Sequence, residues 1–136
     1  MPDEIHVNGN CHCGRISISA IVDKKRVRPC HCTDCQKMSG APFRAIAVAP
    51  AQSIKIDGRP KEYVKISDSG NKRIQAFCSY CGTQLYATDI KKTLFNLRTG
   101  FLEQRRSLEP LEHVFIQSSL PWINSENLNF DVKKIN

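Results

Sequence analysis

The sequence predicts a mostly β fold with one short helix, formed by a single domain over residues 1–136. Short segments in which apolar and polar residues alternate recur along the chain. Glycine, proline and asparagine separate these segments at turn positions. The cysteines occur in close groups, which suits a small fold that is held together by metal.

The clearest strand is predicted at residues 15–22. There Ile16, Ile18, Ala20 and Val22 face one way and more polar residues the other, which is typical of a half-buried strand. Further strands are expected at 5–8, 43–48, 53–57, 61–66, 72–77, 84–87, 93–97 and 113–117. The polar tail after about residue 123 lacks periodicity, so we expect it to be ordered only in part.

The helix is expected at residues 34–39. Thr33 and Gln36 fit a capping box before it, and Gly40 supplies a stop after it. Cys35 would lie in the first turn, with two further cysteines just upstream. Because the amides at a helix start favour anionic sulfur, this position lowers the pKa of a thiol.

Four cysteines form two pairs that are far apart in sequence: Cys11 with Cys13, and Cys78 with Cys81. Each pair is followed by glycine, which lets the chain turn back with a positive φ so that backbone N–H groups can point at the sulfur. Two such turns together predict a closed four-cysteine zinc site. The alternative is two unrelated pairs of free thiols.

The remaining three cysteines, Cys30, Cys32 and Cys35, lie within six residues. Three thiolate ligands around four-coordinate zinc leave one position open, which is typical of a catalytic site. Candidate fourth ligands are His12, His31, His113 and Asp34. His31 lies between two ligands and should point away from them. We therefore prefer an open position filled by water or a substrate thiol, which makes two zinc ions in all.

Charge and composition restrict the alternatives. The net charge of +7 permits anionic partners, but the basic residues are scattered, so nucleic acid is not an expected partner. No apolar run is long enough for a membrane span and the N-terminus lacks a secretory signal, so we expect a cytoplasmic protein. Two other classes stay open: a non-catalytic zinc-binding module for nucleic acid or a protein partner, and a cysteine redox switch.

Three segments resemble motifs of the glutathione-dependent formaldehyde-activating enzymes: residues 9–14, 30–40 and 77–83. The likeness extends from Gly9 to Trp122. It implies several coiled antiparallel β-sheets, similar to methionine sulfoxide reductase B, a fold that also occurs in centromere protein V. It further implies a structural zinc on the four paired cysteines and a catalytic zinc on the other three.

The resemblance also implies an activity. Members of this family are carbon–sulfur lyases that condense glutathione with formaldehyde to S-hydroxymethylglutathione, so the expected partners are a small thiol and a small aldehyde. Three thiolates and a substrate thiolate would leave excess negative charge at the zinc. Lys37 and Arg44 are the nearest cations downstream, and we expect them to offset this charge and to hold the carboxylates of glutathione.

Overall fold

The computed structural model describes residues 3–66, 70–111 and 116–123. Within these ranges the chain is mostly β, with one α-helix, as the sequence predicts. The strands are β1 (Glu4–Asn10), β2 (Ser17–Asp23), β3 (Val27–Cys30), β4 (Arg44–Pro50), β5 (Lys55–Asp57), β6 (Lys61–Ile66), β7 (Lys72–Phe77), β8 (Gln84–Asp89) and β9 (Leu94–Arg98). The helices are α1 (Thr33–Ser39) and the 3-10 turns η1 (Lys24–Arg26), η2 (Ala51–Ser53), η3 (Thr99–Phe101), η4 (Arg105–Ser107) and η5 (Ile116–Ser118).

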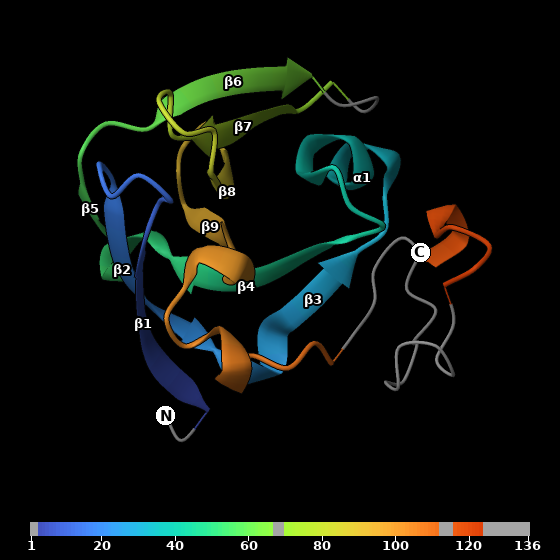
Figure 1. Ribbon diagram of the computed structural model, residues 1–136, viewed down its shortest axis with the longest axis horizontal. Helices are drawn as coiled ribbons and strands as arrows, with labels where there is room; N and C mark the ends of the chain where they lie inside the picture. Colours follow the sequence, from blue (N-terminus) through green and yellow to red (C-terminus); the bar gives the residue numbers. More distant parts are fainter. Residues whose placement is uncertain (1–2, 67–69, 112–115, 124–136) are drawn as a thin grey trace.

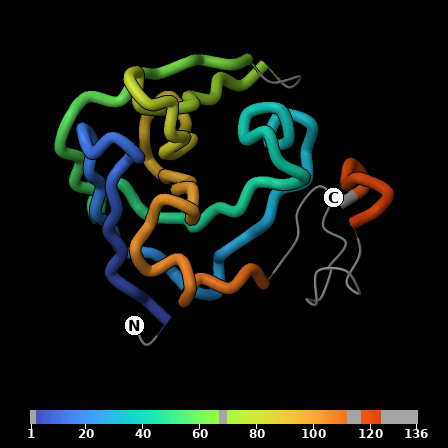
Figure 2. Tube along the Cα trace, in the orientation of Figure 1, coloured from blue at the N-terminus to red at the C-terminus, as the bar shows by residue number. Residues whose placement is uncertain are grey.

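The strands form two antiparallel sheets (Figures 1 and 2). The smaller sheet has the order β1-β2-β5, and the larger has the order β3-β4-β9-β8-β7-β6. Strand β2 of the small sheet packs against β4 of the large one. The helix α1 follows β3 directly and leads into β4, and its Asp34 forms an ion pair with Lys65 of β6, so α1 lies near both edge strands of the large sheet.

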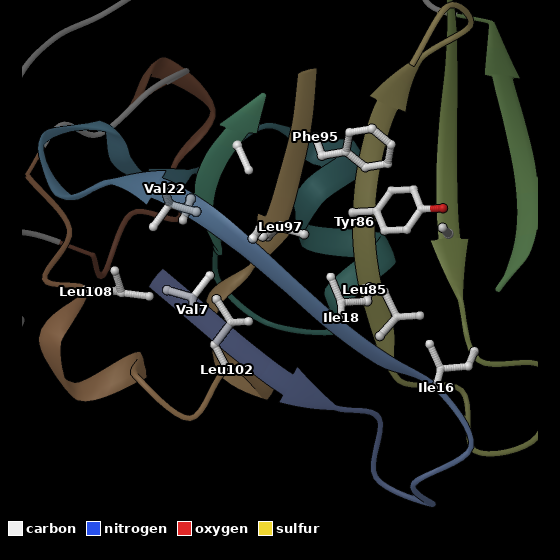
Figure 3. Packing of buried hydrophobic residues seen from close by; sticks show 14 of the residues in the cluster. Val7, Ile16, Ile18, Val22, Leu85, Tyr86, Phe95, Leu97, Leu102 and Leu108 are labelled. Carbon is white, nitrogen blue, oxygen red and sulfur yellow. The ribbon is translucent and has the colours of Figure 1, made fainter. Parts of the chain in front are cut away.

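The core lies between the two sheets (Figure 3). The predicted alternation along β2 is confirmed, because Ile18 and Val22 are buried on one face while Ile21 between them is only half-buried. Leu85 and Leu97 of the large sheet meet this face and are fully buried. Burying an aliphatic side chain of this size contributes on the order of 2 kcal/mol, so this layer fixes how the sheets stack.

The residue that begins α1 differs from the prediction. The cap is Cys32, whose sulfur accepts a hydrogen bond of 3.3 Å from the amide of Cys35, and not Thr33. The predicted capping box is therefore wrong, because Gln36 uses its side-chain amide to donate to the carbonyl of His31 instead. The helix ends as expected at Gly40, which adopts a left-handed φ of 65°.

Two segments differ from the predicted pattern of strands. Strand β3 was not expected, since Pro29 and a short basic sequence conceal it, yet it pairs with β4 over its four residues. The strand expected at 113–117 lies largely outside the described residues. Its last part belongs to η5, a 3-10 turn whose Ser118 carbonyl accepts a hydrogen bond from Gln36 rather than from a neighbouring strand. The tail after residue 123 also lies outside the described ranges.

The turn between β8 and β9 is held by one carboxylate. Asp89 accepts hydrogen bonds of 2.9 Å from both the amide and the hydroxyl of Thr93, and one of 3.3 Å from the amide of Leu94. Burial opposes ionisation of Asp89, but these hydrogen bonds outweigh it and hold the pKa of its carboxyl below the usual value.

A close backbone contact places η3 beside β1. Gly9 of β1 bridges Leu102, and a Cβ at Gly9 would overlap the carbonyl oxygen of Phe101. The amide of Glu103 donates to the carbonyl of Asn8 at 2.8 Å in the same region. A glycine is therefore required at position 9, and the contact fixes the segment that follows β9.

Candidate metal centres

The structure brings together the four cysteines of the two predicted turns. The turns follow β1 and β7, and the four sulfurs lie within 4.8 Å of one another. Cys13 lies centrally, with its sulfur 3.6 Å from that of Cys11 and 3.7 Å from that of Cys78. None of these cysteines, including Cys81, forms a disulfide. Sulfurs at these separations suit the corners of one tetrahedral metal site.

The first turn has the geometry expected of a metal-binding knuckle. Gly14 adopts a φ of 85°, and its amide donates to the carbonyl of Cys11 at 3.0 Å. The amide of Ile16 donates to the sulfur of Cys11 at 3.3 Å. A hydrogen bond from the backbone N–H of Arg15 is the main cause of the lowered pKa of the Cys13 thiol. These donors favour anionic sulfur, as a metal ligand requires.

The second turn repeats this geometry and is joined to the first by Thr83. Gly82 adopts a φ of 79°, and the amide of Cys81 approaches the sulfur of Cys78 at 3.5 Å. The hydroxyl of Thr83 accepts from the amide of His12 at 3.0 Å and lies 3.2 Å from the sulfur of Cys81. Its hydrogen bonds lower the pKa of Cys81 to about 5. Sequence reasoning did not assign a role to Thr83.

A second cluster contains the other three cysteines. Cys30 is the last residue of β3, Cys32 caps α1, and Cys35 lies in the first helical turn. Their sulfurs also lie within 4.8 Å of one another. Cys30 and Cys35 are buried, whereas Cys32 is half-buried and gives the cluster its access to solvent.

Ionisation of one of the three thiols opposes ionisation of the other two. Hydrogen bonds from Cys30 and then Cys35 lower the pKa of Cys32 to about 2. The same contacts, led by Cys32, raise the pKa of Cys30, and the pKa of Cys35 is also raised. One thiolate is therefore stabilised by two thiols that keep their protons. A divalent ion that prefers soft sulfur ligands, such as zinc, would favour all three thiolates, so the donor set fits a metal.

The described candidates for a fourth ligand lie elsewhere. Asp34 forms an ion pair with Lys65. The ring of His31 is buried against Phe43, at 5.2 Å between ring centroids, and burial lowers the pKa of this histidine. His12 is exposed on the first turn. None of these three belongs to the cluster.

His113, the remaining candidate, lies outside the described residues. Within the described part of the chain the second cluster therefore offers three ligand atoms, all sulfur.

The two cations expected beside this cluster have different positions. Lys37 is exposed on α1. Arg44 is buried and pairs with Cys30 across β3 and β4, and its charge helps to lower the pKa of Cys32. A third cation, Arg98, was missed by sequence reasoning, because only its place at the end of a strand could have indicated it.

Arg98 is as buried as Arg44, and each is 6% exposed. Its Nη2 donates to Oε1 of Gln75 at 3.0 Å, and its Nη1 to the carbonyl of Asn96 at 3.3 Å. Burial and then the nearby charge of Arg44 lower the pKa of Arg98 to about 9, so the guanidinium stays charged at neutral pH. Its charge interacts with the thiols of Cys30 and Cys35.

A pocket of about 470 Å³ is lined by neighbours of both clusters, although none of the seven cysteines lines it. It is lined by Ser39, Phe43, Arg44, Ala45, Gly82, Gln84, Arg98, Thr99 and Gly100. Ser39 ends α1, and its hydroxyl donates to the carbonyl of Cys35 at 2.7 Å. Gly82 directly follows Cys81 of the first cluster. The volume lies within the range of small-molecule sites.

Over the described ranges, no helix has both the length and the apolar character that a membrane crossing needs.

Comparison with known proteins agrees with the two clusters. The family model of the glutathione-dependent formaldehyde-activating enzyme matches residues 6–118. A protein of Schizosaccharomyces pombe, described as an uncharacterized lyase, is 35% identical over 78 residues, which are 57% of this chain and 54% of that protein. This match thus spans about half the length of the curated relative.

A crystal structure of a Rhodobacter sphaeroides protein has a similar fold, with a TM-score of 0.57 and 16% sequence identity. The likeness covers 93% of this chain and 98% of that one. At this level of identity, it is a likeness of fold alone. The family match includes both cysteine clusters and extends over most of the sequence. The chain therefore belongs to the glutathione-dependent formaldehyde-activating enzyme family.

Proposed function

We propose that this protein is a zinc-dependent carbon–sulfur lyase that joins a small thiol to a small aldehyde at the cluster of Cys30, Cys32 and Cys35. By family, the thiol is glutathione, the aldehyde is formaldehyde and the product is S-hydroxymethylglutathione. The observation that supports this most directly is the ligand set. Three cysteine sulfurs converge, and no His, Cys, Asp or Glu of the described residues adds a fourth ligand atom. Such a set leaves one metal position for a substrate.

The two clusters have separate roles in this proposal. Cys11, Cys13, Cys78 and Cys81 hold a structural zinc that joins the turns after β1 and β7. The three-cysteine cluster holds the catalytic zinc. A zinc ion bound there would act as a Lewis acid and lower the pKa of a coordinating thiol, so that thiolate is available at neutral pH.

The chain's own residues prepare the site for this chemistry. Cys32, half-buried at the start of α1, leaves the cluster open on one side, while the other two cysteines are enclosed. Arg44 and Arg98 place two positive charges beside sulfurs that carry excess negative charge. In the reaction one C–S bond forms between the thiol sulfur and the carbonyl carbon. The thiol proton ends on the carbonyl oxygen, which becomes a hydroxyl group.

A second candidate, the cysteine redox switch, is favoured by one observation. Cys32 has a strongly lowered pKa and lies beside two other free thiols, which suits disulfide exchange. Metal content separates the two functions. Two zinc ions per chain, with thiols that resist titration, support the enzyme. One zinc ion with three titratable thiols supports the switch.

The activity itself is tested by magnetisation-exchange NMR on mixtures of glutathione and formaldehyde, because uncatalysed addition is already fast. The parent should increase the exchange rate between free glutathione and its hydroxymethyl adduct. Cys32→Ser should return this rate to the uncatalysed value while the protein stays folded. An equal rate with parent, with Cys32→Ser and without protein would contradict the proposal.

A further inference from the structure

One side chain joins the three-cysteine cluster to a segment far along the sequence. Nε2 of Gln36 on α1 donates to the carbonyl of His31 and to the carbonyl of Ser118, each at 2.9 Å. A glutamine amide carries two N–H donors, so these two hydrogen bonds use both of them. The second bond reaches 82 residues along the chain to η5, which ends at Ser118. Gln36 is therefore a direct link between the cluster and the last part of the chain that the structure describes.

The hydrogen bond to His31 acts on the metal ligands. His31 is fully buried and separates Cys30 from Cys32 in the chain. A peptide unit is planar, so fixing the carbonyl of His31 also fixes the amide of Cys32 and limits where its sulfur can lie. Gln36 directly follows Cys35 on α1. Its side chain thus fixes the stretch of chain that carries all three sulfurs.

Residues 116–123, which we call the strap, dock beside this stretch. They comprise η5 and a turn in which the amide of Ile123 donates to the carbonyl of Leu120 at 2.9 Å. Ile123 is only 9% exposed. In Figure 1 the strap, drawn in orange-red, lies near the junction of β3 and α1, which carries the three cysteines. Burial of Ile123 and the hydrogen bond from Gln36 hold the strap in place.

Release of the strap would loosen the hold on His31. With both carbonyls in place, one orientation of the Gln36 amide satisfies both of its N–H groups. Without the carbonyl of Ser118 the side chain regains rotamers that break the bond to His31. The entropy gained in this way is comparable in free energy to what one hydrogen bond contributes. The docked strap therefore favours the arrangement in which the three sulfurs converge.

We propose that docking of the strap and metal binding at the three-cysteine cluster are coupled through Gln36, each strengthening the other by the same factor. The docked strap holds the ligands together for the metal, and the bound metal fixes the stretch on which the strap docks. The strap then regulates the site at which the substrate thiol binds. This regulatory part rests on the proposed function, whereas the coupling itself requires only a metal at the cluster.

Gln36→Glu is the direct test, because a carboxylate has a similar size but accepts hydrogen bonds and donates none. The zinc affinity of each site is measured by competition with a chromophoric chelator. We expect zinc to bind roughly 10-fold more weakly at the three-cysteine cluster, as the loss of two neutral hydrogen bonds implies, and to bind the four-cysteine site as in the parent. The new negative charge attracts a cation, so charge alone would change the affinity in the opposite direction.

Gln104→Glu is the matched control. The amide of Gln104 donates to the side chain of Asn8 at 2.7 Å and so joins the start of η4 to β1 rather than to the cluster. This variant should bind zinc at both sites as the parent does. An unchanged zinc affinity in Gln36→Glu, or an equal loss in Gln104→Glu, would overturn the proposal.

The part played by the strap is tested by Ile123→Asp, which puts a charge at a buried position and leaves Gln36 unchanged. Gln117→Asp puts the same charge at an exposed position of the strap. We expect Ile123→Asp to weaken zinc binding at the cluster roughly 3- to 10-fold and Gln117→Asp to have no effect. Added to Gln36→Glu, Ile123→Asp should cause no further loss, because the link is already broken. Losses that add, or no loss in Ile123→Asp, would overturn the coupling.

Hydrogen exchange of the strap amides measures the reverse direction on the parent, so it decides the proposal even if Gln36→Glu does not fold. The strap should exchange more slowly with both metal sites filled than with only the four-cysteine site filled, and equal rates would overturn the proposal. If the parent binds no zinc at the three-cysteine cluster, this inference and the proposed function both fail. If it does, but Gln36→Glu binds that zinc equally well, only this inference fails. If the coupling is present and the exchange assay shows no catalysis, only the proposed function fails.

Discussion

Serine substitutions in the two clusters should have unequal effects on stability. Cys81→Ser opens the four-cysteine site, which joins Cys13 to Cys78 across 65 residues of chain. Cys32→Ser opens the other site, whose cysteines span only the segment from Cys30 to Cys35. A cross-link stabilises a fold by restricting the unfolded chain, and it does so more when the closed loop is long.

The loop lengths give the magnitude. In the chain-entropy relation, a cross-link over 65 residues contributes about 4 kcal/mol, whereas one over five residues contributes about 2 kcal/mol. Cys32 also caps α1, but serine is itself a preferred cap, so Cys32→Ser keeps the helix start. A domain of this size loses roughly 2–8 °C of Tm for each kcal/mol of destabilisation, so the two variants should differ in Tm by about 5–15 °C.

The assay measures Tm by circular dichroism together with the zinc content of each purified variant. We expect Cys81→Ser to melt well below the parent, or to be unfolded. Cys32→Ser should stay folded, with a loss of Tm about half as large, and should hold one zinc per chain. If the two variants are equally destabilised, the three-cysteine cluster is structural. If Cys81→Ser melts like the parent with all its metal, the pairing of the two turns is wrong.

Three further predictions concern the fold. Gly9→Ala should lose about 1–3 kcal/mol or more of stability in urea unfolding, because its Cβ would overlap a backbone carbonyl. Gly100→Ala should be near neutral, and equal unfolding midpoints for the two variants would refute the close contact. Leu97→Ala, at a fully buried position, should lower the free energy of unfolding by about 2–5 kcal/mol. Leu94→Ala, at a position 43% exposed, should lower it much less, and similar losses in the two variants would contradict the burial of Leu97. The folded state lowers the pKa of Asp89, so its carboxylate stabilises the fold at pH values above the ordinary aspartate pKa of about 4. This contribution is lost as the pH falls through the pKa that Asp89 has in the folded state. Asp89→Asn should thus unfold more easily than the parent at pH 7, and the gap should narrow in acid; a gap that does not depend on pH would exclude this role.

The parts of the fold that depend on local pattern could be predicted from the sequence. The alternation along β2 was sufficient to find its buried face, because period two is a property of any half-buried strand. The glycines after Cys13 and Cys81 predicted positive φ angles, and Gly14 and Gly82 have them. The spacing within the three-cysteine cluster and within each cysteine pair is also local, and the glycine shared by the two pairs indicated that they form one site although 65 residues separate Cys13 from Cys78.

The parts of the fold that depend on contacts between distant segments could not be predicted from the sequence. Strand β3 exists because β4 pairs with it, and Pro29 hides that pairing in the sequence. One miss is local: Cys32 and not Thr33 caps α1, because its sulfur accepts from the amide of Cys35 and cysteine is not among the usual cap residues. Arg98 is brought to the pocket by the order of strands in the large sheet, which no sequence motif indicates.

The most direct test of the central claim, a thiol-binding metal at the three-cysteine cluster, is the absorption spectrum of the cobalt-substituted protein during titration with glutathione. We predict two cobalt ions per chain in the parent, with a sulfur-to-cobalt charge-transfer band that grows on titration as one more thiolate binds. Cys32→Ser should hold one cobalt ion, and its spectrum should not respond to glutathione. A parent spectrum that glutathione leaves unchanged, or an equal response in Cys32→Ser, would contradict the claim.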